Sequence, residues 1–292
     1  MKWFALAAVV GLLNLACLAQ APDSDKPAEA GPPAASSTTS SAQKSHQVDA
    51  TPWLKKIDEK VGQLKTLHAR VRYDTIQGLV GDMQTRFGDL YYDASSPRRF
   101  RIDFDGLVYP GEMRRDLHES LIFDGRYLAD VKRDDKLFHR IELVGAGEDA
   151  KMFDLTDSEF PLPLDFDPQK IQRVYEVVQI DPAMDHPTLH RPLDNVVQLR
   201  LTPRPGRQNM QYRQIDIWFN RDTLLPELVH AIDAGDSGDE SVTLLSEVKT
   251  DVTLDRDMFS TQPPNEPGWE IKLTPLPERR EVKTETEIKV VK

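Results

Sequence analysis

The chain has 292 residues and a formal net charge of −11 at pH 7, a length that suits one or two domains. Such an acidic chain repels the phosphates of nucleic acids and anionic membrane surfaces, so we expect it to bind neither through its overall charge. Cys17 is the single cysteine, and this excludes disulfide bonds within the mature protein.

The first 19 residues have the pattern of a secretory signal peptide. Lys2 precedes an apolar run over residues 3–18, which is too short to span a bilayer comfortably. Two processing routes remain open. Small residues predict signal-peptidase cleavage after Ala19, whereas Asn14-Leu15-Ala16-Cys17 resembles a lipobox, which makes Cys17 a candidate lipidation site and the end of a lipoprotein-type signal.

Residues 20–50 are rich in Pro, Ala and Ser. A segment of this composition cannot bury a core, so we predict a disordered linker. A flexible chain of this length reaches roughly 30 Å on average. Such a spacer is useful to an anchored protein, so it weighs against reading Cys17 simply as a small hydrophobic residue of the signal peptide, and both processing routes stay open.

A helix is predicted to begin at Thr51-Pro52, with Thr51 as the N-cap and Pro52 at the first helical position. A single apolar stripe on an otherwise charged segment predicts that one face of this helix is buried. The stripe consists of Trp53, Ile57, Val61, Leu64 and Leu67.

Short strands dominate the rest of the chain. Phe100, Ile102 and Phe104 alternate with charged residues, which is the period of a half-buried strand. Asp124-Gly125 lies between two apolar runs and predicts a hairpin. The pattern predicts strands at 69–76, 83–92, 98–105, 119–124, 126–132, 136–143, 174–180, 196–202, 214–220, 225–233 and 241–251. Many strands with few helices predict a mainly β, α+β fold with an antiparallel sheet.

An ordered set of short motifs runs through these strands. They are Leu67-His68-Ala69, Gly88-Asp89-Leu90-Tyr91, Pro97 with Phe100, Phe123-Asp124-Gly125, Leu201-Thr202-Pro203, Asn220-Arg221-Asp222, and Phe259 with Pro263-Pro264. In this order and spacing the chain resembles the periplasmic outer-membrane lipoprotein carrier family, the LolA-like proteins, over residues 51–264. The charged segment 265–292 lies beyond the resemblance as a C-terminal tail.

The resemblance implies a strongly curved, unclosed antiparallel sheet, like half a barrel, lidded by short helices. Family members bind the acyl chains of lipoproteins in this concavity. The carriers receive the lipoproteins from an inner-membrane release complex and deliver them to an outer-membrane acceptor. Close members carry an Arg before the family Pro, whereas this chain has Ser96 there, and the loop over 105–118 is longer than the family's.

Apolar residues of the predicted strands are the candidate lining of such a cavity: Tyr91, Phe100, Ile102, Phe104, Phe123, Leu199, Ile217 and Phe219. A packed core needs the same residue types, so sequence alone does not separate a core from a lipid cavity. The candidate partner contacts are Arg98, Arg99, Arg114 and Arg115, which form a cluster of arginines together with Arg101. One interpretation is a binding site for an acidic partner surface or a lipid phosphate. The other is an outer strand face whose arginines pair with acidic neighbours.

Motifs for catalysis or metal binding are weak. His186 and His190 have the spacing of a metal pair, but Pro187 breaks the helix that such a pair needs. The acidic stretch 233–240 has the wrong spacing for an EF-hand and predicts a hairpin turn. The spaced carboxylates Asp157/Glu159 and Asp165/Asp167 lie in a polar loop without a surrounding motif. We therefore expect no enzyme activity, no metal and no cofactor.

These observations predict a monomeric protein of the periplasm or cell envelope, soluble or anchored through Cys17, that binds lipid or lipoprotein acyl chains and takes part in lipoprotein sorting to the outer membrane. The alternative is a membrane-anchored envelope module with a packed core, which presents an interaction surface and carries no lipid. Co-purifying lipid distinguishes the two.

Overall fold

The computed structural model describes residues 48–276, apart from residues 144, 146–161, 163, 165, 183–188, 190–192 and 208–209. The chain divides into two compact units, Met1–Gln43 and Lys44–Lys292, and all described residues belong to the second. Cys17, His186, His190, Asp157, Glu159 and Asp165 lie outside the described residues.

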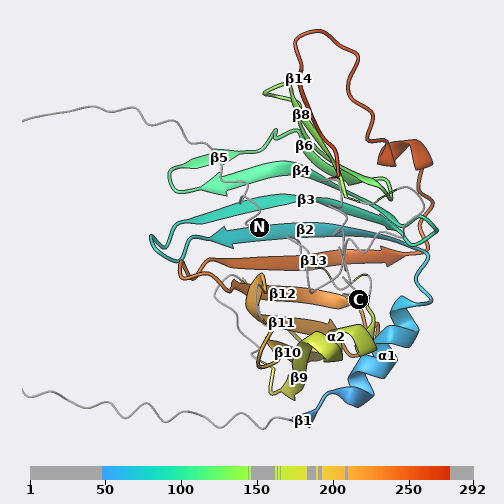
Figure 1. Cartoon of the computed structure of the whole chain (residues 1–292), viewed down its shortest axis with the longest axis vertical. Helices are drawn as coiled ribbons and strands as arrows, with labels where there is room; N and C mark the ends of the chain where they lie inside the picture. The colour runs from blue at the N-terminus through green and yellow to red at the C-terminus, as the bar shows by residue number, and fades with distance from the viewer. Residues whose placement is uncertain are drawn as a thin grey trace, which may run out of the picture. The chain divides into compact units, whose positions relative to one another are not determined.

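A single curved sheet of fourteen strands organises the second unit (Figure 1). The strands are β1 (Val48–Asp49), β2 (Thr66–Ile76), β3 (Met83–Asp93), β4 (Arg99–Tyr109), β5 (Glu112–Arg114), β6 (Glu119–Phe123), β7 (Tyr127–Lys132), β8 (Leu137–Glu142), β9 (Tyr175–Ile180), β10 (Val196–Pro203), β11 (Tyr212–Asn220), β12 (Pro226–Asp233), β13 (Glu240–Thr250) and β14 (Glu270–Thr274). The helices are α1 (Thr51–Val61), α2 (Pro168–Val174) and the short 3₁₀ helix η1 (Arg256–Phe259).

The strand order is β1-β9-β10-β11-β12-β13-β2-β3-β4-β6-β7-β8-β14, with β5 paired to β4. Neighbouring strands are antiparallel except β14, which runs parallel to β8 along one edge. The two ends of this order, β1 and β14, do not pair with each other, so the sheet is not closed. The predicted mainly β fold with an open, curved sheet and a few short helices is confirmed.

Helix α1 begins as predicted but is capped differently. Its N-cap position is Ala50, and the Asp49 carboxylate instead accepts hydrogen bonds from the Thr51 backbone N–H at 2.9 Å and the Thr51 hydroxyl at 2.7 Å. These bonds lower the pKa of Asp49 because they stabilise the charged carboxylate. The prediction of Thr51 as the N-cap was therefore wrong.

The apolar stripe of α1 is shorter than predicted, since the helix ends at Val61. The buried face consists of Leu54, Ile57 and Val61, which are spaced by three and four residues. Trp53 is half-buried. Leu64 and Leu67 are buried beyond the end of the helix, Leu67 at the start of β2.

The predicted loop over residues 105–118 is largely a hairpin. Strand β4 continues to Tyr109, and β5 returns beside it, pairing Tyr109 with Glu112. Gly111 supplies the turn with a φ of 87°, a conformation that costs glycine little. The pairing of β3 with β4 shifts between Phe87 and Gly88, which leaves one extra residue in β4.

Two of the motifs that carry the family resemblance meet at one turn. Gly125 has a φ of 104° in the turn between β6 and β7. A Cβ atom added there would lie 2.4 Å from the Cβ atom of Pro97. Both the backbone conformation and the close approach therefore require glycine, and the hairpin predicted at Asp124-Gly125 is confirmed.

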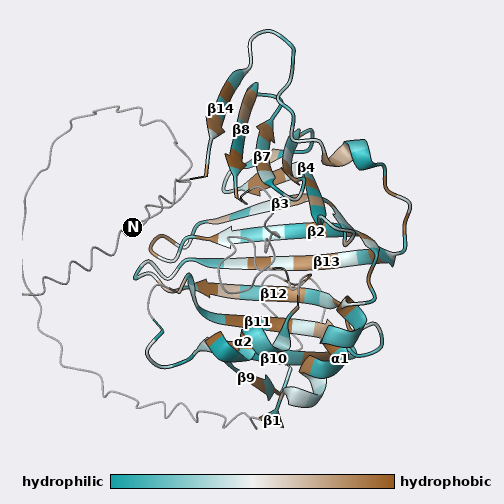
Figure 2. Ribbon diagram, turned by 45° about the vertical axis from the view of Figure 1, so that its right-hand side comes forward, coloured by the Kyte–Doolittle hydropathy of each residue, from teal (hydrophilic) through white to brown (hydrophobic). Residues whose placement is uncertain are grey.

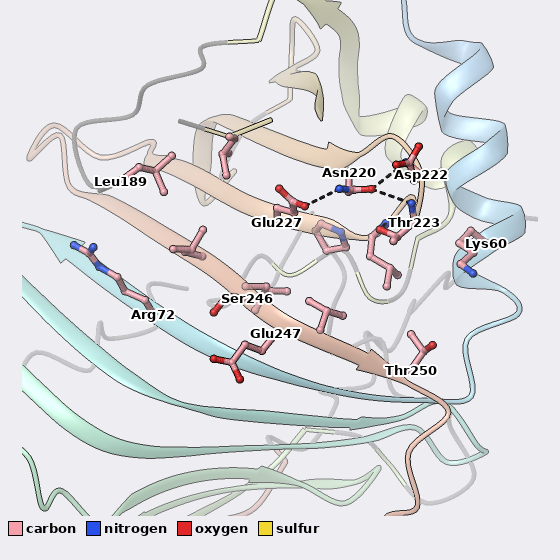
Figure 3. A pocket seen from close by; sticks show the side chains of 16 residues that line it. Lys60, Arg72, Leu189, Asn220, Asp222, Thr223, Glu227, Ser246, Glu247 and Thr250 are labelled. Atoms are coloured by element: carbon pink, nitrogen blue, oxygen red, sulfur yellow. Dashed lines mark hydrogen bonds between the residues drawn. The ribbon is translucent and has the colours of Figure 1, made fainter. Parts of the chain in front are cut away.

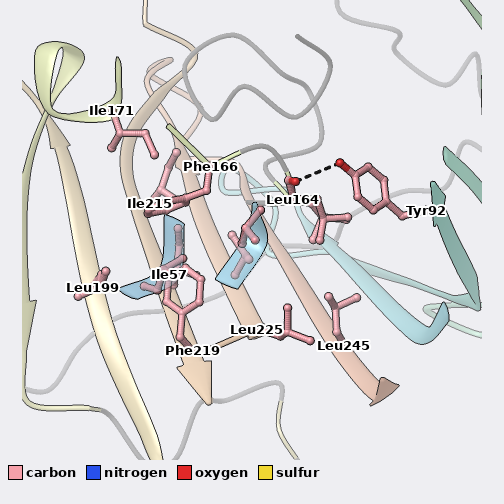
Figure 4. Packing of buried hydrophobic residues seen from close by; sticks show 14 of the residues in the cluster. Ile57, Tyr92, Leu164, Phe166, Ile171, Leu199, Ile215, Phe219, Leu225 and Leu245 are labelled. Carbon is pink, nitrogen blue, oxygen red and sulfur yellow. Dashed lines mark hydrogen bonds between the residues drawn. The ribbon is translucent and has the colours of Figure 1, made fainter. Parts of the chain in front are cut away.

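The main core lies on one face of the sheet, against α1, α2 and the residues just before α2 (Figure 4). Figure 2 shows apolar and polar residues alternating along many of the strands, so that only one face contributes to this core. Tyr92 donates a hydrogen bond from its hydroxyl to the Leu164 carbonyl at 3.2 Å. Phe166 meets Phe219 edge to face, with ring centroids 6.0 Å apart. We call this face the inner face.

Two smaller apolar clusters lie on the opposite, outer face. One consists of Leu193, Val196, Trp218, Leu228 and Val242, with Ile76, Leu189 and Leu244 packed against it. The other consists of Ile122, Ala129, Val131 and Phe138, with Trp269 packed against it. The segment after β13 crosses this second region, where the Met258 carbonyl accepts a hydrogen bond from Arg101 Nη1 at 2.9 Å.

Candidate functional site

Most of the predicted cavity-lining residues come together on the inner face. Six of them are at most 1% exposed: Phe100, Ile102, Phe123, Leu199, Ile217 and Phe219. Phe104 is partly buried and packs against the same cluster. Side chains of α1, of Ile171 in α2 and of Leu162, Leu164 and Phe166 fill the space in front of them. In this structure the inner face is a packed core.

Tyr91 does not face this core. Its ring stacks on His68 on the outer face, with centroids 4.9 Å apart and an interplanar angle of 13°. Burial raises the pKa of the Tyr91 phenol, and the nearby Asp89 carboxylate acts in the same direction. Strict alternation along β3 places Leu90 and Tyr92 on the inner face instead. Tyr92, and not Tyr91, is therefore the tyrosine of this strand that faces the core.

The predicted basic contacts do not form one cluster. Arg98 and Arg99 lie at the start of β4, whereas Arg114 pairs with Leu107 near its far end. Eight residues of extended strand separate Arg99 from Leu107, which is about 26 Å. Arg114 also forms an ion pair with Asp134 at 3.2 Å, and Arg115 lies beside the Met113 sulfur.

A pocket of about 660 Å³ opens where β12 and β13 part (Figure 3). These strands pair from Leu228 with Leu244 to Ile232 with Glu240, and no further. Pro226 begins β12 and has no N–H to donate to a ladder, so the strand does not extend its pairing with β13 there.

Strand β13 bends away at the same level. Its pairing with β2 shifts between Ser246 and Lys249, and Glu247 adopts a φ of 51°. A residue in the left-handed region within a shifted register is a β-bulge, which bends the strand. The bulge and Pro226 together account for the opening.

Apolar side chains from both faces of the sheet form the walls of the pocket. Leu225 and Leu245 belong to the main core, whereas Leu193, Leu189 and Leu244 belong to the outer cluster. The pocket therefore connects apolar regions that the sheet separates elsewhere. The polar residues that line it are Lys60, Arg72, Asn220, Asp222, Thr223, Glu227, Ser246, Glu247 and Thr250.

Part of this polar lining is held rigidly by the turn after β11. Asn220 donates from Nδ2 to Glu227 Oε1 at 2.8 Å. Its Oδ1 accepts hydrogen bonds from the backbone N–H groups of Asp222 at 2.9 Å and Thr223 at 3.0 Å. These bonds fix the turn predicted at Asn220-Arg221-Asp222 and hold one side of the pocket in place.

Local sequence patterns indicate little of this pocket. Pro226 after an apolar pair is a recognisable break at the start of a strand. The bulge at Glu247 has no such signal, because Glu favours neither a positive φ nor a particular register. The pocket depends on how β13 pairs with two different neighbours, and local patterns do not carry that information.

The acidic stretch after β12 is a hairpin turn, as predicted. Asp233 accepts a hydrogen bond from the Gly235 N–H, and Asp239 accepts one from the Gly78 N–H. Among the described residues, no group of three or more His, Cys, Asp or Glu side chains could hold a metal ion. Asp167, one of the spaced carboxylates, caps α2 by accepting from the Lys170 N–H at 3.0 Å.

In the part of the chain that the structure describes, no helix has both the length and the apolar character needed to cross a membrane.

No family model and no curated protein matches the sequence. Among solved structures, the chain is similar to an uncharacterized conserved protein from Thermus thermophilus, with 9% identity and a TM-score of 0.42 over 78% of this chain and 100% of that one. It is similar to a LolA superfamily protein from Nitrosomonas europaea, with 14% identity and a TM-score of 0.34 over 73% and 98% of the two chains. It is also similar to a putative outer membrane lipoprotein-sorting protein domain from Vibrio parahaemolyticus, with 10% identity and a TM-score of 0.36 over 72% and 97%.

Proposed function

We propose that this chain is a binding protein of the cell envelope that shelters the acyl chain of a lipid or lipoprotein. The observation that carries the proposal is the pocket between β12 and β13, with apolar walls from two clusters and a polar lining. Its volume of about 660 Å³ falls in the range of ~300–1,000 Å³ that is usual for small-molecule sites.

The physical reason for an enclosed apolar site is the cost of exposing an alkyl chain to water. Each buried methylene contributes about 0.8 kcal/mol, so ten methylenes contribute about 8 kcal/mol. Leu225, Leu244 and Leu245 offer apolar surface at the level where the strands part. An acyl chain that enters between the strands exchanges water for these side chains.

The N-terminal pattern supports a location in the cell envelope. The apolar run over residues 3–18 and the spacer over 20–50 support export and a location in the periplasm, with or without a lipid anchor at Cys17. The ordered motifs support a role in lipoprotein sorting to the outer membrane, with an inner-membrane release complex and an outer-membrane acceptor as partners. In this role the chain binds and transfers, and it does not catalyse a reaction.

A second candidate function is an anchored interaction module that carries no lipid. The packed inner face favours it, because Phe100, Ile102 and Phe219 are at most 1% exposed and belong to one buried apolar cluster. The two functions differ in one respect that can be measured, which is whether the pocket holds an acyl chain.

Lipid binding is tested with protein purified from its native host and with the matched variants Ser246→Trp and Lys249→Trp. Both residues are exposed on β13, but only Ser246 lines the pocket. We expect mass spectrometry to detect co-purifying acyl lipid in the wild-type protein. We expect Ser246→Trp to weaken binding of an ω-labelled fluorescent fatty acid at least about tenfold, with little change in Lys249→Trp. Absence of both co-purifying lipid and fatty-acid binding would favour the interaction module.

Anchoring is a separate question that concerns Cys17. Metabolic labelling with a clickable fatty acid is compared between the wild type and Cys17→Ala. A covalent anchor predicts label that survives denaturation in the wild type and is lost in the variant. Equal label in both proteins after denaturation would contradict lipidation at Cys17.

A further inference from the structure

Three basic residues lie on α1 and on the turn after β11, two elements that each contribute residues to the lining of the pocket. Lys56 and Lys60 are one helical turn apart on α1, which places their Cβ atoms about 6 Å from each other. Arg221 immediately precedes Asp222 and Thr223, which line the pocket, and Lys60 lines it directly. We call Lys56, Lys60 and Arg221 the basic cluster.

Two members of the basic cluster form cation–π contacts with the Trp53 ring. The Lys56 Nζ atom lies 4.8 Å from the centroid of the Trp53 ring, and the Arg221 Cζ atom lies 5.3 Å from it. The indole is fixed in turn, because its Nε1 donates to Gln179 Oε1 at 3.0 Å. Arg221 is also fixed by a hydrogen bond from Nε to the Val196 carbonyl at 2.9 Å.

The basic cluster is not neutralised by the described part of the protein. None of its three residues forms an ion pair with a described carboxylate. Asp222 and Glu227, which line the pocket, accept hydrogen bonds from the neutral amides of Asn195 and Asn220 and keep their negative charges, but neither forms an ion pair with the basic cluster. Glu247 is exposed on the opposite strand, β13. Cations held on one ring and one helix face repel each other, and a bound anion relieves that repulsion.

We infer that the pocket takes an acyl lipid with an anionic head group, a carboxylate or a phosphate, and that the basic cluster binds this head group. The inference rests on the proposed function, since it names the class of lipid for the same pocket. Figure 3 shows Lys60 and Leu189 at opposite ends of the pocket. The alkyl chain then extends from Lys60 toward the apolar wall of Leu225, Leu244 and Leu189. Carboxylates farther than about 8 Å from the head group are largely screened at physiological salt, so the net charge of the whole chain does not decide the choice of head group.

The test measures binding of three single-chain lipids below their aggregation limits: hexadecanoate, hexadecyl phosphate and hexadecanol. They compete with an ω-labelled fluorescent fatty acid for the full mature protein. We compare the wild type with the triple variant Lys56→Gln/Lys60→Gln/Arg221→Gln. A control of equal charge change is Lys55→Gln/Lys65→Gln/Arg133→Gln, whose sites are exposed and do not line the pocket.

We expect the wild type and the control to bind at least one of the two anionic lipids about tenfold or more tightly than hexadecanol. We expect the triple variant to bind all three alike, with hexadecanol affinity unchanged. A preference for hexadecanoate over hexadecyl phosphate, or the reverse, identifies the head group. Raising the salt concentration should weaken the preference.

Other results would overturn the inference in distinguishable ways. Binding of all three lipids with equal affinity by the wild type would refute the head-group site and leave the proposed function intact. An equal loss for hexadecanol in the triple variant would show that the basic cluster only shapes the pocket. Binding of none of the lipids would contradict the proposed function itself. Retention on phosphatidylglycerol vesicles without binding of monomeric lipid would show a membrane-docking surface instead.

Discussion

Strand pairs β2–β3 and β12–β13 belong to the same sheet but differ in continuity. The first pair matches residue for residue from Thr66 with Asp93 to Ile76 with Met83. The second stops at Leu228 with Leu244, after which β13 pairs with β2 alone. Where the ladder is continuous, the sheet separates an apolar inner face from a polar outer face. Where it stops, apolar side chains of both faces line one pocket.

The largest expected effect comes from a substitution at Gly88 in β3, where this strand lies close against β4. A Cβ atom there would lie 2.1 Å from the Asp103 carbonyl oxygen, so β3 and β4 must move apart. We expect Gly88→Ala to lower the free energy of unfolding by about 3 kcal/mol or more. Urea denaturation followed by circular dichroism measures the change.

Gly106 provides the matched control on the facing strand. Its added Cβ atom would lie 3.5 Å from the Phe87 ring, an ordinary contact. We expect Gly106→Ala to change the free energy of unfolding by less than about 1 kcal/mol. Equal destabilisation by the two variants would show that the close pairing of β3 and β4 does not limit stability.

An intermediate effect is expected in the split region at Glu247. Its φ of 51° is costly for a residue with a side chain, by about 1–2 kcal/mol. Glycine removes that strain but increases the entropy of the unfolded chain. We expect Glu247→Gly to raise the free energy of unfolding by about 0.5 kcal/mol, the balance of these two effects. Chemical denaturation measures it.

Lys249 lies two residues further along the same strand and is paired with His68. In this regular position glycine has no strain to remove, so Lys249→Gly should lower the free energy of unfolding by about 0.5–1 kcal/mol. Destabilisation by Glu247→Gly of the same size would argue against a built-in bulge at the pocket.

The smallest effect concerns the edge formed by β8 and β14. His139 Nε2 lies 2.9 Å from the Thr274 hydroxyl. Burial lowers the pKa of His139, and Lys272 acts in the same direction while Asp130 opposes it. His139 therefore binds a proton more readily in the unfolded chain than in the folded protein. The stability that the neutral imidazole contributes to the folded protein is lost as the pH falls below about 6.5.

We expect the melting temperature of the wild type to fall slightly more between pH 7.5 and pH 5.5 than that of His139→Gln. The comparison between variants cancels the titration of the other histidines. An identical fall in both proteins would show that His139 does not contribute to this pH dependence.

The strands were largely predictable, because half-buried strands alternate with a period of two. Phe100 and Ile102 in β4 and Ile215 and Ile217 in β11 follow this period, and they face the core. The Asp124-Gly125 hairpin was predictable because a φ of 104° at its second residue favours glycine.

The site was not predictable in the same way. Whether Phe219 lines a cavity or a packed core depends on Phe166, which meets it from another part of the chain. The parallel pairing of β14 joins Ile271 to Phe138, far away in the sequence, within an otherwise charged tail. These features depend on long-range pairing, which a local pattern does not specify.

The most direct test of the account is photoaffinity labelling with a fatty acid that carries a diazirine in the middle of its alkyl chain. We predict that peptide mapping finds label on the pocket walls at Leu225, Leu244 and Leu245, and that excess unlabelled fatty acid removes it. Label on the inner-face core residues Phe100, Ile102 and Phe123, or no label that excess fatty acid removes, would contradict binding between β12 and β13.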